Sequence, residues 1–119
     1  MIDYKKYKVW QKSHALVLNI YNLTSSFPDL EKFNLVTQIN RAATSIPTKI
    51  AEGCGRETQK ELLRFLYISS GSAHELEYLI ILSRDLNYLQ SNSAEAILSD
   101  IIEIKKMLAS LIRKIKSTL

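Results

Sequence analysis

Apolar residues recur through most of the chain at steps of three and four residues, with polar residues between them. This spacing places the apolar side chains on one face of an α-helix. The pattern is interrupted three times, so it predicts four helices, at about residues 6–25, 30–53, 58–88 and 92–117. Four helices with short connections are typical of an antiparallel up-and-down bundle. The sequence therefore predicts an all-α four-helix bundle with a single domain over residues 1–119.

Prolines and a glycine punctuate the first half of this pattern. Pro28 should end the first helix, because the residue before a proline disfavours the helical conformation. Pro47 lies inside the second helix and should kink it, since a proline removes one backbone hydrogen bond and clashes one turn back. Gly53 is the expected C-terminal cap of that helix.

The starts of the last two helices carry capping signals. The sequence "TQKE" places Thr58 three residues before Glu61, which is the spacing of a capping box. The fourth helix follows "QSNS", so Ser91 or Asn92 should be its N-cap.

The third helix is apolar on more than one side. Phe65, Ile68 and Leu76 belong to one apolar face, while Tyr67 and Tyr78 belong to another. A monomer of this size cannot bury both faces, so we expect a second, intermolecular interface in a homo-oligomer.

Composition fits one helical domain in a reducing compartment. The chain has 119 residues, 46% of them hydrophobic, with three glycines and two prolines, which disfavours a turn-rich β-fold. Cys54 is the only cysteine, so no internal disulfide is expected. The opening "MIDYKKYKVWQKS" lacks the apolar core of a signal peptide, and apolar runs such as "LIIL" are too short to cross a bilayer. We expect a cytoplasmic protein with no membrane partner.

The net charge of +4 is unevenly distributed. Residues 13–104 carry seven lysines and arginines against eleven aspartates and glutamates, whereas the remaining end segments carry nine against Asp3 alone. Such asymmetry indicates polyanion binding, head-to-tail attraction between subunits, or simple solubility.

The end of the fourth helix is the strongest functional signal. Lys105, Lys106, Arg113 and Lys116 share an arc beside the apolar stripe, which suits the phosphate backbone of RNA or DNA. The alternative is a solvated face whose cations complement the helix C-terminus. No aromatic residues interleave this arc and no base-reading motif is present, so binding should be weakly selective and sensitive to salt. The candidate nucleic-acid-binding residues are Lys5, Lys6, Lys8, Lys105, Lys106, Arg113, Lys114 and Lys116.

Polar residues beside the core predict a structural network. Glu75 falls at the centre of the predicted apolar face of the third helix, where a carboxylate needs a donor such as Arg41 or Arg56. We expect a buried Arg–Glu network that fixes helix register or subunit geometry. General acid or base catalysis by Glu75 is the enzymatic alternative. The proposed network residues are Gln38, Arg41, Ser45, Glu52, Arg56, Ser72 and Glu75.

Other chemistry is disfavoured by spacing. The stretch "SIPTKIAEGCGR" lacks the spacing of a phosphate-binding loop, and Cys54 has no histidine in its own helix to act as a base. The di-metal centres of some bundles need Glu-x-x-His pairs, but Gln11 and Gly71 precede His14 and His74 at that step. We therefore expect no catalytic residues, no metal and no cofactor.

Three motifs, "QINRAATSIP", "IAEGCGR" and "GSAHELE" in that order, resemble those of the 23S rRNA intervening-sequence proteins, a family of four-helix bundles. Genes of that family often lie inside intervening sequences of large-subunit ribosomal RNA genes. Relatives include the accessory variability protein of diversity-generating retroelements, a basic bundle that works with a reverse transcriptase. The resemblance implies a homopentamer. Lys49 departs from the family pattern, which usually has asparagine there.

Together these features predict a non-enzymatic oligomeric scaffold or adaptor. Its expected partners are copies of itself, RNA or DNA, and a nucleic-acid enzyme. The alternatives are a pure protein–protein interaction module without nucleic-acid affinity and a small enzyme that uses Glu75.

Overall fold

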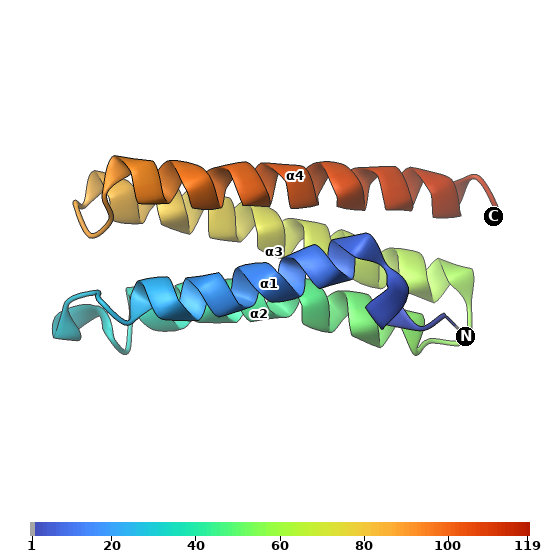
Figure 1. The fold of residues 1–119 in the computed structure, drawn as a ribbon. Helices are drawn as coiled ribbons and strands as arrows, with labels where there is room; N and C mark the ends of the chain where they lie inside the picture. Colours follow the sequence, from blue (N-terminus) through green and yellow to red (C-terminus); the bar gives the residue numbers. More distant parts are fainter. Residues whose placement is uncertain (1) are drawn as a thin grey trace.

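The computed structural model describes residues 2–119 and consists of four long helices with two short 3-10 helices (Figure 1). The elements in chain order are η1 (Tyr4–Lys6), α1 (Lys8–Thr24), η2 (Asp29–Glu31), α2 (Leu35–Cys54), α3 (Gln59–Asp85) and α4 (Ser91–Lys116). Consecutive long helices run antiparallel, so both termini and the α2–α3 turn share one end of the bundle (Figure 1). The predicted all-α four-helix bundle is confirmed.

The core is a column of branched apolar side chains between the helices. Each long helix contributes one buried stripe, as the 3.6-residue period requires. Among neighbouring long helices, α2 and α3 pack on each other most extensively, and α1 and α4 least. The largest fully buried apolar side chains are those of Leu16, Ile20, Ile39, Ile46, Ile50, Leu66, Leu76, Ile80, Ile101, Ile104 and Leu108.

The second helix begins later than predicted. Its first residue is Leu35 rather than a residue near position 30, because Asp29–Glu31 form the separate 3-10 helix η2. Asn34 between them has φ −126° and ψ −96°, which is not helical. The buried side chain of Glu31 accounts for this interruption, since it holds η2 against Tyr88 in the connection between α3 and α4.

Gly53 is not the cap of α2. The helix continues through it to Cys54, and Gly55 is the C-cap residue. Gly53 instead permits close contact between α2 and α3, because a Cβ atom there would lie 2.9 Å from Leu62 Cδ1 and 2.9 Å from Phe65 Cβ. The glycine that looks like a helix stop in the sequence is therefore a packing residue. Helix α2 also continues through the buried Pro47, where the kink stays a prediction.

The ends of α3 and α4 differ in how well the sequence describes them. Thr58 Oγ1 accepts a hydrogen bond of 3.1 Å from the backbone amide of Glu61, so the predicted cap is confirmed. Helix α3 ends at Asp85, and Asn87 follows with φ 64°, a left-handed conformation that asparagine tolerates. The predicted cap of α4 is wrong. Gln90 occupies that position without a side-chain cap, and both Ser91 and Asn92 lie inside the helix.

Candidate nucleic-acid interface

The antiparallel fold collects positive charge in one half of the bundle. The half with both termini and the α2–α3 turn comprises residues 2–16, 45–72 and 104–119 (Figure 1). It contains thirteen lysines and arginines against four aspartates and glutamates, which gives +9. The other half contains three against eight, which gives −5. The bundle is 46 Å long and 24 Å wide, so the two charges are separated along its axis.

The cations of α4 fall into two groups. Lys106, Arg113 and Lys114 are exposed. Lys105 instead pairs with Glu77 of α3, with 2.9 Å between Nζ and Oε1. The Lys116 ammonium donates a hydrogen bond of 3.2 Å to the phenolic oxygen of Tyr67. The arc predicted as one continuous row therefore includes side chains that tie α4 to α3.

The N-terminal lysines lie at the same end of the bundle. Lys5, Lys6 and Lys8 are all exposed on η1 and the first turn of α1. The short helix η1 is fixed by two contacts: Asp3 Oδ1 accepts from the amide of Lys5 at 3.0 Å, and Gln11 Nε2 donates to the carbonyl of Lys5 at 2.9 Å. These lysines are thus held at the end of the bundle where η1 packs on α1 and α2.

Sequence reasoning missed a third group of cations at the α2–α3 turn. Lys49, Arg56 and Arg64 gather around the ring of Phe65, at 5.9, 4.7 and 5.7 Å from its centroid. Arg64 and Phe65 are adjacent in the chain, but Lys49 and Arg56 come from α2 and the turn. The close packing of α2 on α3, which Gly53 permits, brings them together.

Glu75 is exposed, which contradicts the predicted buried carboxylate. The buried stripe of α3 runs through Ser69 and Ala73, both fully buried, whereas Ile68 beside them is 38% exposed. The prediction centred the stripe on large apolar residues. The small residues actually face the core, because they allow α2 to pack closely.

The predicted polar network is present only in part. Ser72 Oγ donates to Ser45 Oγ at 2.9 Å and joins α3 to α2. Within residues 2–119, neither Arg41 nor Arg56 pairs with Glu75. The remaining members bond to near neighbours: Gln38 Nε2 donates to Asn34 Oδ1 at 3.2 Å, and Glu52 pairs with Lys49 at 3.1 Å.

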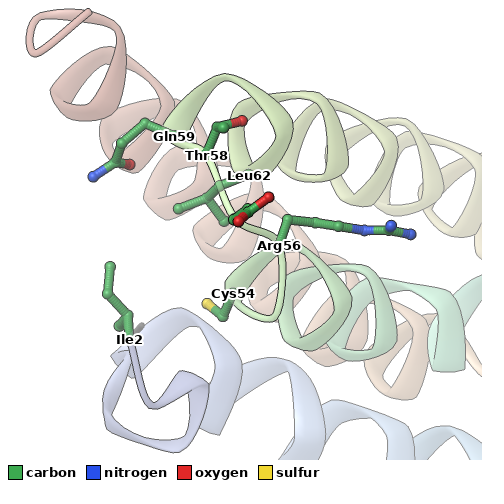
Figure 2. Close-up of a pocket in the computed structure, with 8 residues that line it drawn as sticks. Ile2, Cys54, Arg56, Thr58, Gln59 and Leu62 are labelled. Carbon is green, nitrogen blue, oxygen red and sulfur yellow. The ribbon is translucent and has the colours of Figure 1, made fainter.

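Cys54 lies beside a cavity of about 300 Å³ at the α2–α3 turn (Figure 2). Ile2, Thr58 and Leu62 are among its other lining residues. Burial, together with the nearby Asp3 carboxylate, raises the pKa of the Cys54 thiol. The group is therefore a protonated thiol at neutral pH, which is a poor nucleophile. Arg56 also lines the cavity, although its side chain extends away from Cys54 in Figure 2.

Within residues 2–119, histidine, cysteine, aspartate and glutamate do not converge in threes as a metal site would need. None of the helices in this part of the chain is both long and apolar enough to span a bilayer.

Comparison with known families matches most of the chain. The model of the family described as 23S rRNA-intervening sequence protein matches residues 5–110. The chain belongs to this family. The matched segment includes all of α1, α2 and α3 and ends within α4, so Arg113, Lys114 and Lys116 lie beyond it.

A solved structure shows the same fold. It is the crystal structure of a Bacteroides thetaiotaomicron protein of unknown function from the S23 ribosomal protein family. The two chains are 31% identical with a TM-score of 0.82, and the alignment covers 88% of this chain and 95% of the other. Among curated proteins, none matches the chain.

Proposed function

We propose that the protein is a non-enzymatic scaffold whose basic half binds the phosphate backbone of RNA or DNA. The observation that carries this proposal is the charge of +9 gathered in one half of the bundle. The N-terminal lysines, the exposed cations of α4 and the α2–α3 turn all contribute to it. A cationic surface of this kind gains affinity by releasing the counterions condensed on a nucleic acid.

The acidic half should orient the bound nucleic acid. Its charge of −5 repels phosphates, so the nucleic acid approaches the end with the termini rather than the length of the bundle. The contacts would be to phosphates, which carry no sequence information by themselves. Binding is therefore expected to be weakly selective and to weaken steeply with salt.

Self-association forms part of the same proposal. Leu18 and Tyr21 on α1 and Tyr78 on α3 are more than half exposed, as large apolar side chains seldom are without a partner. The resemblance to family members that form pentamers supports five copies. In a ring of parallel subunits the basic ends would lie together and raise the affinity for one polyanion.

A protein–protein interaction module without nucleic-acid affinity is the second candidate. It is supported by an open hollow of about 690 Å³ along the outer face of α2. Tyr21 borders the hollow, and Thr44, Ser45 and Thr48 contribute small side chains to it. Small residues on a helix let a helix of a partner protein approach closely. A nucleic-acid enzyme is the partner that would supply this helix.

Gel-shift titration at low and high salt separates the two candidates. Replacing Lys106, Arg113 and Lys114 by glutamine should weaken binding of both a structured RNA and a DNA duplex. The plot of log K against log salt should become less steep, with the magnitude of its negative slope reduced by roughly 2 to 3. Each lost phosphate contact removes about 0.7 to 0.9 from that magnitude.

The matched control removes three cations from the acidic half by replacing Lys32, Arg41 and Arg84 with glutamine. This control should leave the salt slope unchanged. No shift of either nucleic acid at low salt would exclude the nucleic-acid proposal and favour the interaction module. Light scattering on the same samples tests self-association, and a monomer at micromolar concentration would exclude the oligomeric scaffold.

A further inference from the structure

Lys49, Arg56 and Arg64 form a cation cluster around the aromatic ring of Phe65. Phe65 is only 6% exposed, yet it stands apart from the apolar cluster that fills the bundle. Cationic side chains from α2, the turn and α3 approach its ring instead. The Arg56 guanidinium is the closest, at 4.7 Å from the ring centroid. Attraction between a cation and an aromatic ring holds these side chains in place.

The positive charges of this cluster are incompletely balanced. Lys49 pairs with Glu52 of its own helix, with 3.1 Å between Nζ and Oε1. Within residues 2–119, neither Arg56 nor Arg64 forms an ion pair or a side-chain hydrogen bond with a carboxylate. Two guanidinium groups beside one ring repel each other, and in the described part of the chain neither has a carboxylate within ion-pairing distance.

A guanidinium that lies against an aromatic ring keeps N–H donors free to bind an oxyanion. The Arg56 guanidinium lies 4.7 Å from the Phe65 centroid and forms no ion pair with a carboxylate of residues 2–119. The contact with the ring restricts the side chain, so less conformational entropy is lost when a ligand binds. Arg56 is one of the residues that line the Cys54 cavity, but its side chain extends away from Cys54 (Figure 2).

We propose that a phosphate group binds at the cation cluster, between Arg56 and Arg64, with Lys49 as the third cation. A phosphate oxyanion offers several acceptor oxygens in three dimensions and can accept from both guanidinium groups at once. A phosphate monoester carries close to two negative charges at neutral pH and neutralises both arginines, whereas a backbone phosphodiester carries one charge. A carboxylate also carries one charge, but it is planar and offers fewer acceptor oxygens. The site is separate from the exposed cations of α4 and of the N-terminus.

NMR titration with inorganic pyrophosphate tests the site directly. The Nε–Hε signals of Arg56 and Arg64 should shift and saturate as pyrophosphate is added to the full chain. Replacing both arginines by glutamine should weaken pyrophosphate binding by about tenfold for each residue, because a charge-assisted hydrogen bond is lost at each. Lys60→Gln is the matched control, since it removes an exposed cation from the start of α3 that does not contact Phe65.

A second variant separates geometry from charge. Replacing both arginines by lysine keeps the charge but removes the fork of donors, so pyrophosphate binding should also weaken. Thermal unfolding of each variant checks that the bundle remains folded. Arginine signals that do not saturate, or equal affinity in the wild-type and double-glutamine proteins, would overturn the proposal. So would an equal loss of affinity in Lys60→Gln.

The source of the phosphate is found by competition. Single-stranded RNA is added to the protein saturated with pyrophosphate. If the arginine signals move to a new position, RNA displaces pyrophosphate and backbone phosphates occupy the site. If the signals do not change, the site binds a small phosphate compound. The outcome is independent of the gel shift proposed above, which tests Lys106, Arg113 and Lys114.

Discussion

The phenolic hydroxyl of Tyr88 donates a hydrogen bond of 2.8 Å to Oε2 of Glu31, 57 residues earlier in the chain. This contact joins the α3–α4 connection to η2 at the acidic end of the bundle. Glu31 is 8% exposed, and its other carboxylate oxygen accepts from Asn34 Nδ2 at 3.2 Å. A buried carboxylate is costly unless donors surround it, so the hydrogen bond stabilises this end of the fold.

Tyr88→Phe should destabilise the protein, because it leaves the Glu31 carboxylate short of one donor. Urea unfolding at neutral pH should show a lower midpoint than in the wild-type protein. Tyr78→Phe is the control, since Tyr78 is 61% exposed and its hydroxyl meets solvent. Equal midpoints for the two variants would contradict a stabilising role of the contact.

The same contact predicts a pH dependence. The hydrogen bond to Glu31, with burial as a lesser cause, raises the pKa of Tyr88 above its ordinary value of 10.0. A group whose pKa is raised on folding contributes stability that is complete below its unfolded pKa and is lost as the pH rises through the folded value. The free energy of unfolding should therefore fall above pH 10. The fall should be smaller in Tyr88→Phe, and equal falls would contradict this assignment.

Gly53→Ala and Gly71→Ala should have opposite effects on stability. A Cβ atom at Gly53 would lie 2.9 Å from Phe65 Cβ, so α2 and α3 must separate, at a cost of roughly 1–3 kcal/mol. A Cβ atom at Gly71 meets no heavy atom within 4 Å, and alanine is the better helix former. Gly71→Ala should stabilise the protein by roughly 0.5–1 kcal/mol. Chemical denaturation of both variants checks this, and equal effects would remove the packing role of Gly53.

Lys105 and Lys106 should differ in function although they are adjacent. Lys105 pairs with Glu77 and both side chains are about one-quarter exposed, so the pair should contribute less than about 1 kcal/mol. A double-mutant cycle with Lys105→Met and Glu77→Gln measures that coupling. Lys106→Met should leave stability unchanged and weaken RNA binding. If Lys105→Met lost RNA binding and Lys106→Met did not, the assignment of Lys105 to stability and Lys106 to RNA binding would be wrong.

Cys54 should react slowly with iodoacetamide in the folded protein. Burial and the Asp3 carboxylate raise the pKa of its thiol from 9.0, so the thiolate is scarce at neutral pH. The reaction rate should still be rising above pH 9.0 and should increase when the chain is unfolded in urea. Mass spectrometry of quenched samples measures the rate. Rapid labelling of the folded protein at neutral pH would show an activated cysteine.

The sequence predicts where the helices lie better than it predicts which face of each helix is buried. The 3.6-residue period is sufficient to find four helices and the Thr58 cap, because both depend on residues close together in the chain. The buried face of α3 is harder, since Ser69 and Ala73 are buried while Ile68 is exposed. Small residues reach the core where helices pack closely, and a pattern of large apolar residues does not reveal that. For this reason the sequence pattern places Glu75 on the buried face, whereas its side chain is exposed.

The candidate interface was found in part for the same physical reason. The lysines at the chain ends are visible as runs of charge, and the antiparallel order of helices brings them together. The cluster around Phe65 depends on contact between α2 and α3 at Gly53. That contact is tertiary, and in the sequence a glycine before "CGR" reads more readily as a helix terminator.

The axial separation of charge makes each bundle a rod with unlike poles. Rods that align side by side in the same direction bring like poles together, and the resulting repulsion opposes a ring of parallel copies. A polyanion that spans the positive poles would neutralise this repulsion. Polyanion binding and assembly of the ring would then favour each other. Salt would weaken polyanion binding, but it would also screen the repulsion between the positive ends and so favour assembly.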